Sequence, residues 1–189
     1  MTSKSEIRER HRMLRKSLKN EDREILSEKI TERFLEFLDK RKEIQHVHIF
    51  LPIERLLEVN TYALLKKLFE RKINVYTSLV SKDKITLDTV ALHRESVFAI
   101  DKWGIPIPEN AEKISSDEIQ LVVIPLLAFD LKGHRLGYGK GFYDRFLESL
   151  KQPVFKVGFS YFDPVESIPH ENHDIALDIC ITPGKILSF

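Results

Sequence analysis

The densest group of residues suited to chemistry lies between positions 133 and 144, in the segment GHRLGYGKGFYD. Its four glycines within nine residues allow the backbone to take positive φ or to approach a ligand closely. Amide N–H groups freed by such a turn, followed by the start of a helix, form a concavity that binds anions. Arg135 and Lys140 add two positive charges. The segment therefore predicts a phosphate-binding loop.

Two well-known phosphate loops do not fit this segment. A Walker A motif requires glycine at position 134 and serine or threonine at position 141, where this chain has His134 and Gly141. A dinucleotide fingerprint requires the spacing GxGxxG, whereas the glycines here alternate from 137 to 141. A flexible hairpin tip is the alternative interpretation. Neighbouring apolar residues, which indicate a packed loop, argue against it: Leu136, Phe142, Tyr143 and Phe146.

The rest of the chain predicts the elements that position the loop. Residues 5–42 carry apolar side chains at spacings of three and four, which predicts two helices, the second capped by Asn20. Two further helices are predicted at 62–71 and 142–150. Short apolar runs predict the strands, at 47–51, 73–76, 85–87, 121–124, 154–159 and 179–181.

Strands that alternate with helices indicate an α/β fold. We expect a layered, mostly parallel or mixed central sheet flanked by helices, with N-terminal helices beside it. No repeat or low-complexity linker interrupts the chain, so a single domain over residues 1–189 is expected. The one cysteine, Cys180, lies in an apolar run and is expected to be a small buried residue.

Composition restricts the class of partner. A net charge of +1 argues against a general nucleic-acid binder, because such proteins carry a basic excess. No apolar run approaches the about 18 residues that span a bilayer, and the charged N-terminus lacks a secretory signal. We expect a cytoplasmic monomer that acts on small molecules and binds neither nucleic acid nor membrane.

Residues 128–147, AFDLKGHRLGYGKGFYDRFL, resemble the signature of the 5-formyltetrahydrofolate cyclo-ligase family, also called methenyltetrahydrofolate synthetases. The resemblance covers nearly the whole chain, because other family elements follow in order. These are a Lys-x-x-x-Arg helix at Lys4 and Arg8, a loop containing Glu58, a Trp-x-Ile-Pro element at 103–106 and a His-Asp-x-x-x-Asp segment at 173–178. Phe142 stands where many relatives carry tyrosine.

The resemblance implies a reaction, its cofactors and a nucleotide site. The reaction is the cyclisation of 5-formyltetrahydrofolate to 5,10-methenyltetrahydrofolate, with Mg²⁺ and with ATP converted to ADP and phosphate. Arg135 and Lys140 would offset charge during phosphoryl transfer and are the implied catalytic residues. The implied ATP-binding residues are Lys4, Arg8, Arg135, Gly137, Tyr138, Gly139, Lys140, Gly141, Phe142 and Tyr143. Without the resemblance, Lys4 and Arg8 would be interpreted as a solvated helix face.

The resemblance also implies metal and folate sites. Asp144 and Asp174 are the implied Mg²⁺ ligands, with Asp178 in reserve; an aspartate that complements a helix dipole is the alternative for Asp144. The implied folate-binding residues are Leu51, Glu58, Trp103 and Tyr143. Glu54 remains an alternative to Glu58, and a core position remains an alternative for Trp103.

Two other function classes stay open on the residues alone. One is a kinase or phosphatase that uses the same loop on another small molecule. The other is a non-catalytic module that binds nucleotides or anions.

Overall fold

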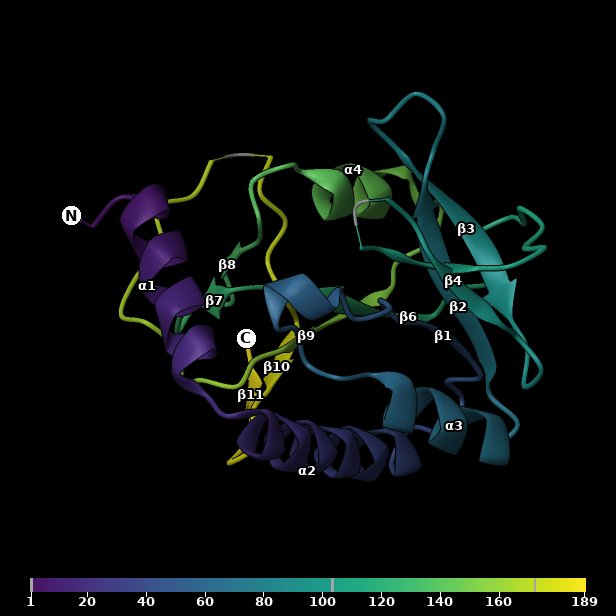
Figure 1. Cartoon of the computed structure of the whole chain (residues 1–189), viewed down its shortest axis with the longest axis horizontal. Coiled ribbons are helices and arrows are strands. Elements are labelled where there is room, and N and C mark those ends of the chain that lie inside the picture. Colours follow the sequence, from purple (N-terminus) through teal and green to yellow (C-terminus); the bar gives the residue numbers. More distant parts are fainter. Residues whose placement is uncertain (1, 103, 172) are drawn as a thin grey trace.

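The computed structural model describes residues 2–102, 104–171 and 173–189 (Figure 1). Its centre is a seven-stranded sheet in the order β11-β10-β9-β6-β1-β2-β3. The strands are β1 (His46–His48), β2 (Asn74–Val80), β3 (Leu87–Leu92), β6 (Leu121–Pro125), β9 (Phe155–Phe159), β10 (Ile179–Ile181) and β11 (Ile186–Ser188). The five inner strands are parallel, and the edge strands β3 and β11 are antiparallel to their neighbours. The predicted α/β fold class is confirmed.

Helices cover both faces of this sheet. The described chain has the helices α1 (Lys4–Ser17), α2 (Asn20–Asp39), the 3₁₀ helix η1 (Glu54–Leu56), α3 (Tyr62–Glu70) and α4 (Phe142–Ser149). Helices α2 and α3 lie together on one face and α4 lies on the other, while α1 stands apart beside two short strands (Figure 1). Those strands, β7 (Ala128–Phe129) and β8 (Arg135–Leu136), form a hairpin, and β4 (Phe98–Ile100) pairs with β5 (Pro106–Pro108).

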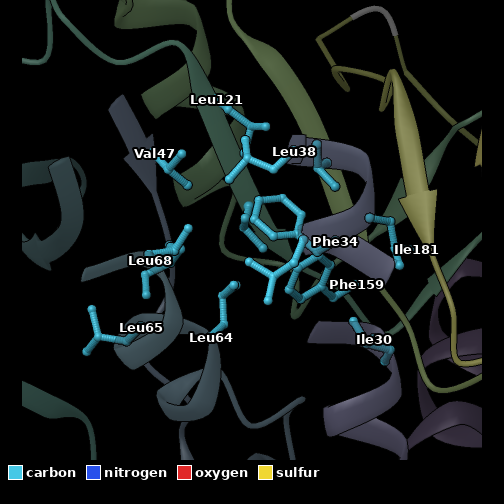
Figure 2. Packing of buried hydrophobic residues seen from close by; sticks show 14 of the residues in the cluster. Ile30, Phe34, Leu38, Val47, Leu64, Leu65, Leu68, Leu121, Phe159 and Ile181 are labelled. Carbon is cyan, nitrogen blue, oxygen red and sulfur yellow. The ribbon is translucent and has the colours of Figure 1, made fainter. Parts of the chain in front are cut away.

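The core explains why these patterns fold together. The apolar stripe of α2 includes Ile30 and Phe34, both fully buried, and the Phe34 ring meets Phe159 of β9 edge to face at 5.4 Å (Figure 2). Strand β6 is covered on both faces, so it is an unbroken apolar run: Leu121 faces the α2–α3 side and Val122 faces the α4 side. Two apolar layers therefore hold the sheet between the helices.

The order of the strands indicates where a ligand is expected to bind. Strand β1 leads to β2 on one side of the sheet, whereas β6 leads to β9 on the other. The chain thus reverses its direction of travel between β1 and β6. In open α/β sheets, ligands bind in the crevice outside the carboxyl ends of the strands at such a switch point.

Some local predictions are wrong. Asn20 does not cap α2: Lys19 precedes the helix without a side-chain cap, and Asn20 is the first helical residue, where its Oδ1 accepts a hydrogen bond from Arg23. Strand β1 ends at His48, three residues before the predicted end, and the strand predicted at 85–87 begins only at Leu87. The short strands β4, β5, β7, β8 and β11 were not predicted, because two or three residues are too few to show a period-two pattern.

Cys180 is fully buried, as predicted. Within the described residues, no helix combines the length and apolar character needed to cross a bilayer.

Candidate active site

The β7–β8 hairpin sets the entry to the glycine loop. Asp130, 2% exposed, accepts hydrogen bonds from the backbone N–H groups of Lys132 (2.9 Å), His134 (3.0 Å) and Ile168 (3.0 Å), and its carboxylate also contacts Nδ1 of His134 at 3.0 Å. Gly133 has φ +82, and a Cβ there would lie 2.8 Å from the carbonyl oxygen of Leu177. Gly133 therefore serves close packing in the hairpin, and the other three glycines form the loop itself.

The loop from Gly137 to Gly141 leads directly into α4. Gly139 and Gly141 have φ values of +90 and +65, and Gly141 precedes the helix without a side-chain cap. A Cβ added at Gly137 would meet nothing within 4 Å, and the Lys140 side chain is exposed. The loop thus combines open space at Gly137 with a helix start whose N–H groups have no side-chain cap, which is the arrangement expected for binding an anion.

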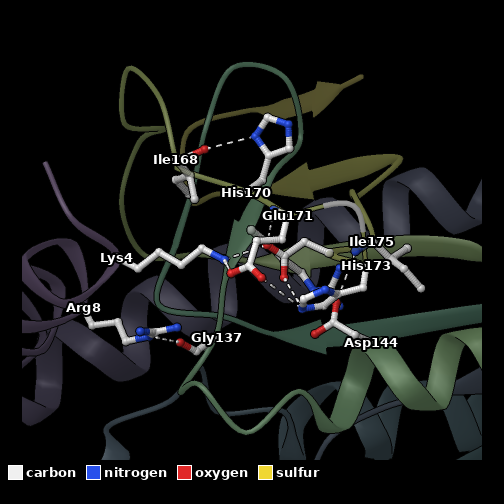
Figure 3. Close-up of polar contacts among 11 residues, drawn as sticks. Lys4, Arg8, Gly137, Asp144, Ile168, His170, Glu171, His173 and Ile175 are labelled. Atoms are coloured by element: carbon white, nitrogen blue, oxygen red, sulfur yellow. Dashed lines mark hydrogen bonds and ion pairs between the residues drawn. The ribbon is translucent and has the colours of Figure 1, made fainter. Parts of the chain in front are cut away.

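Helix α1 supplies cations to this loop. A capping box between Ser3 and Glu6 starts the helix, and Ile7 packs against the β7–β8 hairpin. Nε of Arg8 donates to the carbonyl oxygen of Gly137 at 3.0 Å, and Nζ of Lys4 lies 2.7 Å from Asp174. Figure 3 shows Arg8 reaching from α1 to Gly137 and Lys4 reaching to Glu171. The prediction that Lys4 and Arg8 share a face is confirmed.

Arg135 and Asp144 pair at the base of the loop. Nη2 of Arg135 lies 2.7 Å from Oδ1 of Asp144, which also accepts from the backbone N–H of Ile175 at 3.2 Å. The Arg135 side chain is 6% exposed, and burial lowers its pKa, although the charge and hydrogen bond of Asp144 oppose the shift. The positive charge at the base of the loop is thus buried and held by a carboxylate.

Asp174 joins the same cluster from the C-terminal segment. Its Oδ2 accepts from Lys4 and from the backbone N–H of Glu171 at 2.9 Å. Burial alone would raise the pKa of Asp174, but these hydrogen bonds and the charges of Lys4 and His173 outweigh burial and hold it below its usual value. Asp178 instead contacts Lys156, both through its backbone N–H (2.8 Å) and its Nζ (2.9 Å). Among the described residues, no three His, Cys, Asp or Glu side chains gather as a ready metal centre.

Glu58, rather than Glu54, points into the protein. Leu57 has φ 50, in the left-handed region, and this turn after η1 directs the next side chain inward. Glu58 is 5% exposed and accepts from the backbone N–H of Ile53 at 2.8 Å, whereas the Glu54 side chain is 86% exposed. Burial raises the pKa of Glu58, against hydrogen bonding from Ile53 and Tyr138.

A cavity of about 500 Å³ opens beside Glu58. Its walls come from α2, the β1–α3 connection, α3 and the β4–β5 region. The apolar part includes Pro52, Tyr62, Ile100 and Pro106, and the charged members are Arg23, Glu24, Glu54, Arg55 and Glu58. A flat ring system with a few polar groups suits such a slot. Leu51 is buried in the core cluster next to it, and Trp103 lies outside the described residues.

Tyr143, in the first turn of α4 directly after the loop, packs against strand β1. Its ring meets His48 of β1 at 6.1 Å and Phe146 at 6.3 Å, both edge to face. Burial and the charge of Glu58 raise the pKa of Tyr143, and the charge of Arg135 opposes them. Tyr143 therefore lies within the electrostatic reach of both the loop cation and the buried carboxylate.

Known proteins are similar to this chain over most of its length. The model of the 5-formyltetrahydrofolate cyclo-ligase family matches residues 1–183. The chain belongs to the 5-formyltetrahydrofolate cyclo-ligase family. The 5-formyltetrahydrofolate cyclo-ligase of Mycoplasma genitalium is 27% identical over 186 residues, covering 97% of this chain and 100% of that relative. The one from Escherichia coli K12 is 30% identical over 148 residues, or 74% of this chain and 79% of that protein.

Solved structures agree with the cyclo-ligase assignment. The NMR structure of Aquifex aeolicus 5,10-methenyltetrahydrofolate synthetase has a TM-score of 0.82 and 30% identity, covering 98% of this chain and 92% of that one. The Mycoplasma pneumoniae synthetase has a TM-score of 0.76, with 96% and 99% coverage, and its 23% identity supports the fold. The chain is therefore an enzyme of the ligase type.

One residue of this cyclo-ligase site was missed by the sequence prediction. Arg15 of α1 is 3% exposed; its Nη1 donates to the Tyr138 hydroxyl at 2.8 Å and to the carbonyl oxygen of Leu56 at 3.2 Å. The signal was available, since Arg15 continues the stripe from Lys4 and Arg8 at helical spacing. A basic residue on the buried face of a helix is a candidate for a specific buried partner.

Proposed function

We propose that the protein converts 5-formyltetrahydrofolate to 5,10-methenyltetrahydrofolate, using ATP and Mg²⁺ and releasing ADP and phosphate. The observation that carries this proposal is the meeting of two sites at the β1–β6 switch point. The glycine loop follows β6, and the ring-sized cavity with Glu58 follows β1. Arg15 joins them, because its Nη1 donates to the Tyr138 hydroxyl of the loop (2.8 Å) and to the carbonyl oxygen of Leu56, two residues before Glu58 (3.2 Å). A phosphate donor and a cyclic acceptor would thus be bound side by side.

The chemistry explains why ATP is required. The formyl group on N5 is an amide, whose oxygen is a poor leaving group. Attack of this oxygen on the γ-phosphate breaks the bond to ADP and leaves an iminium carbon bearing a phosphate ester. N10 then adds to that carbon and loses its proton, and phosphate departs as the methenyl bridge forms. Such a reaction depends on positioning and on neutralising phosphate charge, rather than on a protein nucleophile.

The residues present suit an ATP site. In this proposal, backbone N–H groups from Gly137 to Gly141 and the start of α4 bind phosphate oxygens. Arg135 and Lys140 stabilise charge on the transferred phosphate, and Lys4 and Arg8 approach the nucleotide from α1. Phe142 and Tyr143 begin α4 beside the phosphates. The open space at Gly137 and the exposed Lys140 support this assignment.

Asp144 and Asp174 fit a magnesium ion. Asp144 uses Oδ1 for Arg135 and Ile175, and Asp174 uses Oδ2 for Lys4 and Glu171. Within the described part of the chain, the second oxygen of each carboxylate accepts no hydrogen bond. Mg²⁺ prefers oxygen ligands and keeps several waters, so two carboxylates beside phosphate suffice. When bound, the ion would neutralise phosphate charge.

The cavity suits the folate. We assign Glu58 to the donor groups of the pterin, and Tyr143 to the wall between pterin and phosphate. Leu51, whose side chain is buried, would contribute through its backbone. Trp103 stays a predicted folate contact. We further propose that the enzyme works as a cytoplasmic monomer.

Product formation and phosphate release together test this proposal. Purified protein is mixed with 5-formyltetrahydrofolate and MgATP, and the near-ultraviolet absorbance of the methenyl product is followed together with phosphate release. We expect equal amounts of product and phosphate. Folded protein that binds MgATP but forms no methenyl product at any concentration would overturn the proposal. Phosphate release that requires a different acceptor would point to a kinase or phosphatase.

A further inference from the structure

The Tyr138 hydroxyl joins the two halves of the site. It accepts the 2.8 Å hydrogen bond from Arg15, whose Nη1 also donates to the carbonyl oxygen of Leu56, two residues before Glu58. A guanidinium can only donate, so the proton of the hydroxyl remains available for an acceptor. Burial and the charge of the Glu58 carboxylate raise the pKa of Tyr138, so the hydroxyl lies within the electrostatic reach of that carboxylate.

Arg15 is itself held in place by two backbone acceptors. Besides Tyr138, it donates to the carbonyl oxygen of Leu56, two residues before Glu58, and to that of Leu126, which leads from β6 toward the hairpin. Arg8, two turns earlier on the same helix, holds the carbonyl oxygen of Gly137, the residue before Tyr138. The position of Tyr138 is therefore set jointly by α1, the η1 segment and the glycine loop.

The Glu58 carboxylate is held at one oxygen by the backbone. It is almost fully buried, and its Oε2 accepts from the backbone N–H of Ile53. A second donor, the Tyr138 hydroxyl, would fix how the carboxylate is turned, so that its remaining lone pairs point in one direction. That direction decides how well it can accept hydrogen bonds from a ligand in the cavity.

We propose that Tyr138 is a positioning residue that couples nucleotide binding to folate binding. Phosphates bound to the Gly137–Gly141 backbone hold the loop, the loop holds the Tyr138 hydroxyl against Glu58, and Glu58 is then oriented for the folate. The coupling must be reciprocal, so each substrate tightens the other, by about tenfold for a coupling of ordinary size. This inference rests on the proposed function, which supplies the two ligands.

The test measures the coupling in Tyr138→Phe, which keeps the ring and removes the hydroxyl. Dissociation constants for 5-formyltetrahydrofolate are determined by calorimetry with and without saturating Mg²⁺ and the non-hydrolysable analogue AMP-PNP. In the wild type, we expect the nucleotide to tighten folate binding about tenfold. In Tyr138→Phe, the ratio of the two constants should fall to near one.

Tyr161→Phe is the matched control. The Tyr161 hydroxyl donates to the backbone oxygen of Glu58 at 2.8 Å and contacts Ser27, so its loss also removes a buried hydroxyl from the Glu58 segment, but one without contact to the loop. This control should keep the wild-type ratio. A merely structural role for Tyr138 predicts similar changes in both variants.

The outcomes separate the two proposals. A wild-type ratio of one, or an unchanged ratio in Tyr138→Phe, would overturn the coupling even if methenyl product forms normally. Absence of product in the wild type would overturn the proposed function instead. Thermal unfolding checks that each variant is folded, and Tyr138→Leu replaces Tyr138→Phe if the latter is not.

Discussion

Arg135 and Asp144 form a 2.7 Å ion pair that joins the start of the glycine loop to the first turn of α4. The arginine is nearly buried and the carboxylate is one-quarter exposed. A cation suited to phosphate and a carboxylate suited to Mg²⁺ therefore hold each other in place. Because the side chains are already ordered, binding of MgATP would require little reorganisation of either.

Replacing Asp144 by asparagine should remove both the negative partner of Arg135 and a proposed metal ligand. We expect the rate of methenyl formation to fall by about 100-fold or more, the size seen when one preorganised electrostatic group is lost. The Mg²⁺ concentration that gives half-maximal rate should rise as well. Glu148→Gln changes an exposed carboxylate on the same helix and should leave both quantities unchanged. Normal Mg²⁺ dependence in Asp144→Asn would remove this residue from the metal site.

Gly137→Ala tests whether phosphate touches the loop backbone. Its conformation and surroundings accept a methyl group, since φ is outside the left-handed region and nothing lies within 4 Å of the new Cβ. The fold should therefore be stabilised slightly, by about 0.4–1 kcal/mol, because the unfolded chain loses freedom. A bound phosphate would collide with the methyl group, so the KM for ATP should rise about tenfold.

Gly184→Ala provides the comparison for that prediction. Gly184 has the same open surroundings but lies in the turn between β10 and β11. It should gain the same stability and keep a normal KM for ATP. Equal KM values in the two variants would show that nucleotide does not approach Gly137.

Glu58→Gln should separate stability from function. Burial raises the folded-state pKa of Glu58 above the unfolded value of 4.5. Protonation of Glu58 therefore stabilises the folded protein fully below pH 4.5, and this stabilisation is lost as the pH rises through the folded-state pKa. Glutamine avoids the buried charge, so urea denaturation should show a more stable variant at pH 8 and little difference at pH 4. Folate binding should weaken by about 10- to 100-fold, the value of a hydrogen bond to a charged group.

Glu54→Gln tests the alternative to Glu58, because the exposed Glu54 side chain lies at the edge of the same cavity. It should leave stability unchanged and weaken folate binding less than Glu58→Gln does. A loss of folate binding in Glu54→Gln but not in Glu58→Gln would exchange their roles.

His48 should make the protein sensitive to acid. It is fully buried in β1, where Nε2 contacts the Ser78 hydroxyl at 2.7 Å, and burial lowers its pKa from 6.5 to about 3. The unfolded chain therefore takes up this proton first, and the stabilisation present above pH 6.5 is lost as pH falls toward 3. At pH 5 the loss amounts to about 2 kcal/mol.

His48→Gln should remove that component of the pH dependence. Between pH 7 and pH 5, the unfolding free energy measured in urea should fall less in this variant than in the wild type. His93→Gln, at an exposed position, should retain the wild-type slope. An equal slope in His48→Gln and wild type would mean that His48 is not the acid-sensitive group.

The sequence predicts features that depend on local patterns. The stripe of α2, the apolar run of β6 and the turn into α4 at Gly141 each follow from residues close together in the chain. Lys4 and Arg8 were placed correctly because helical spacing alone puts them on one face.

The missed features depend on distant contacts. Arg15 meets Tyr138 across 123 positions, and the switch point between β1 and β6 follows from the strand order of the whole sheet. The sequence left open whether Glu54 or Glu58 points into the protein, because this depends on the left-handed turn at Leu57. The residues of η1 do not predict that conformation.

The burial of Cys180 makes the protein convenient for fluorescence labelling. Its thiol lies within the sheet with its pKa raised by burial, so it should stay inert toward maleimide dyes in the folded protein. Since the chain holds no other cysteine, Arg12→Cys on the outer side of α1 would take up a single dye. The emission of that dye would then report in real time whether the helix that carries Lys4, Arg8 and Arg15 shifts as substrates arrive.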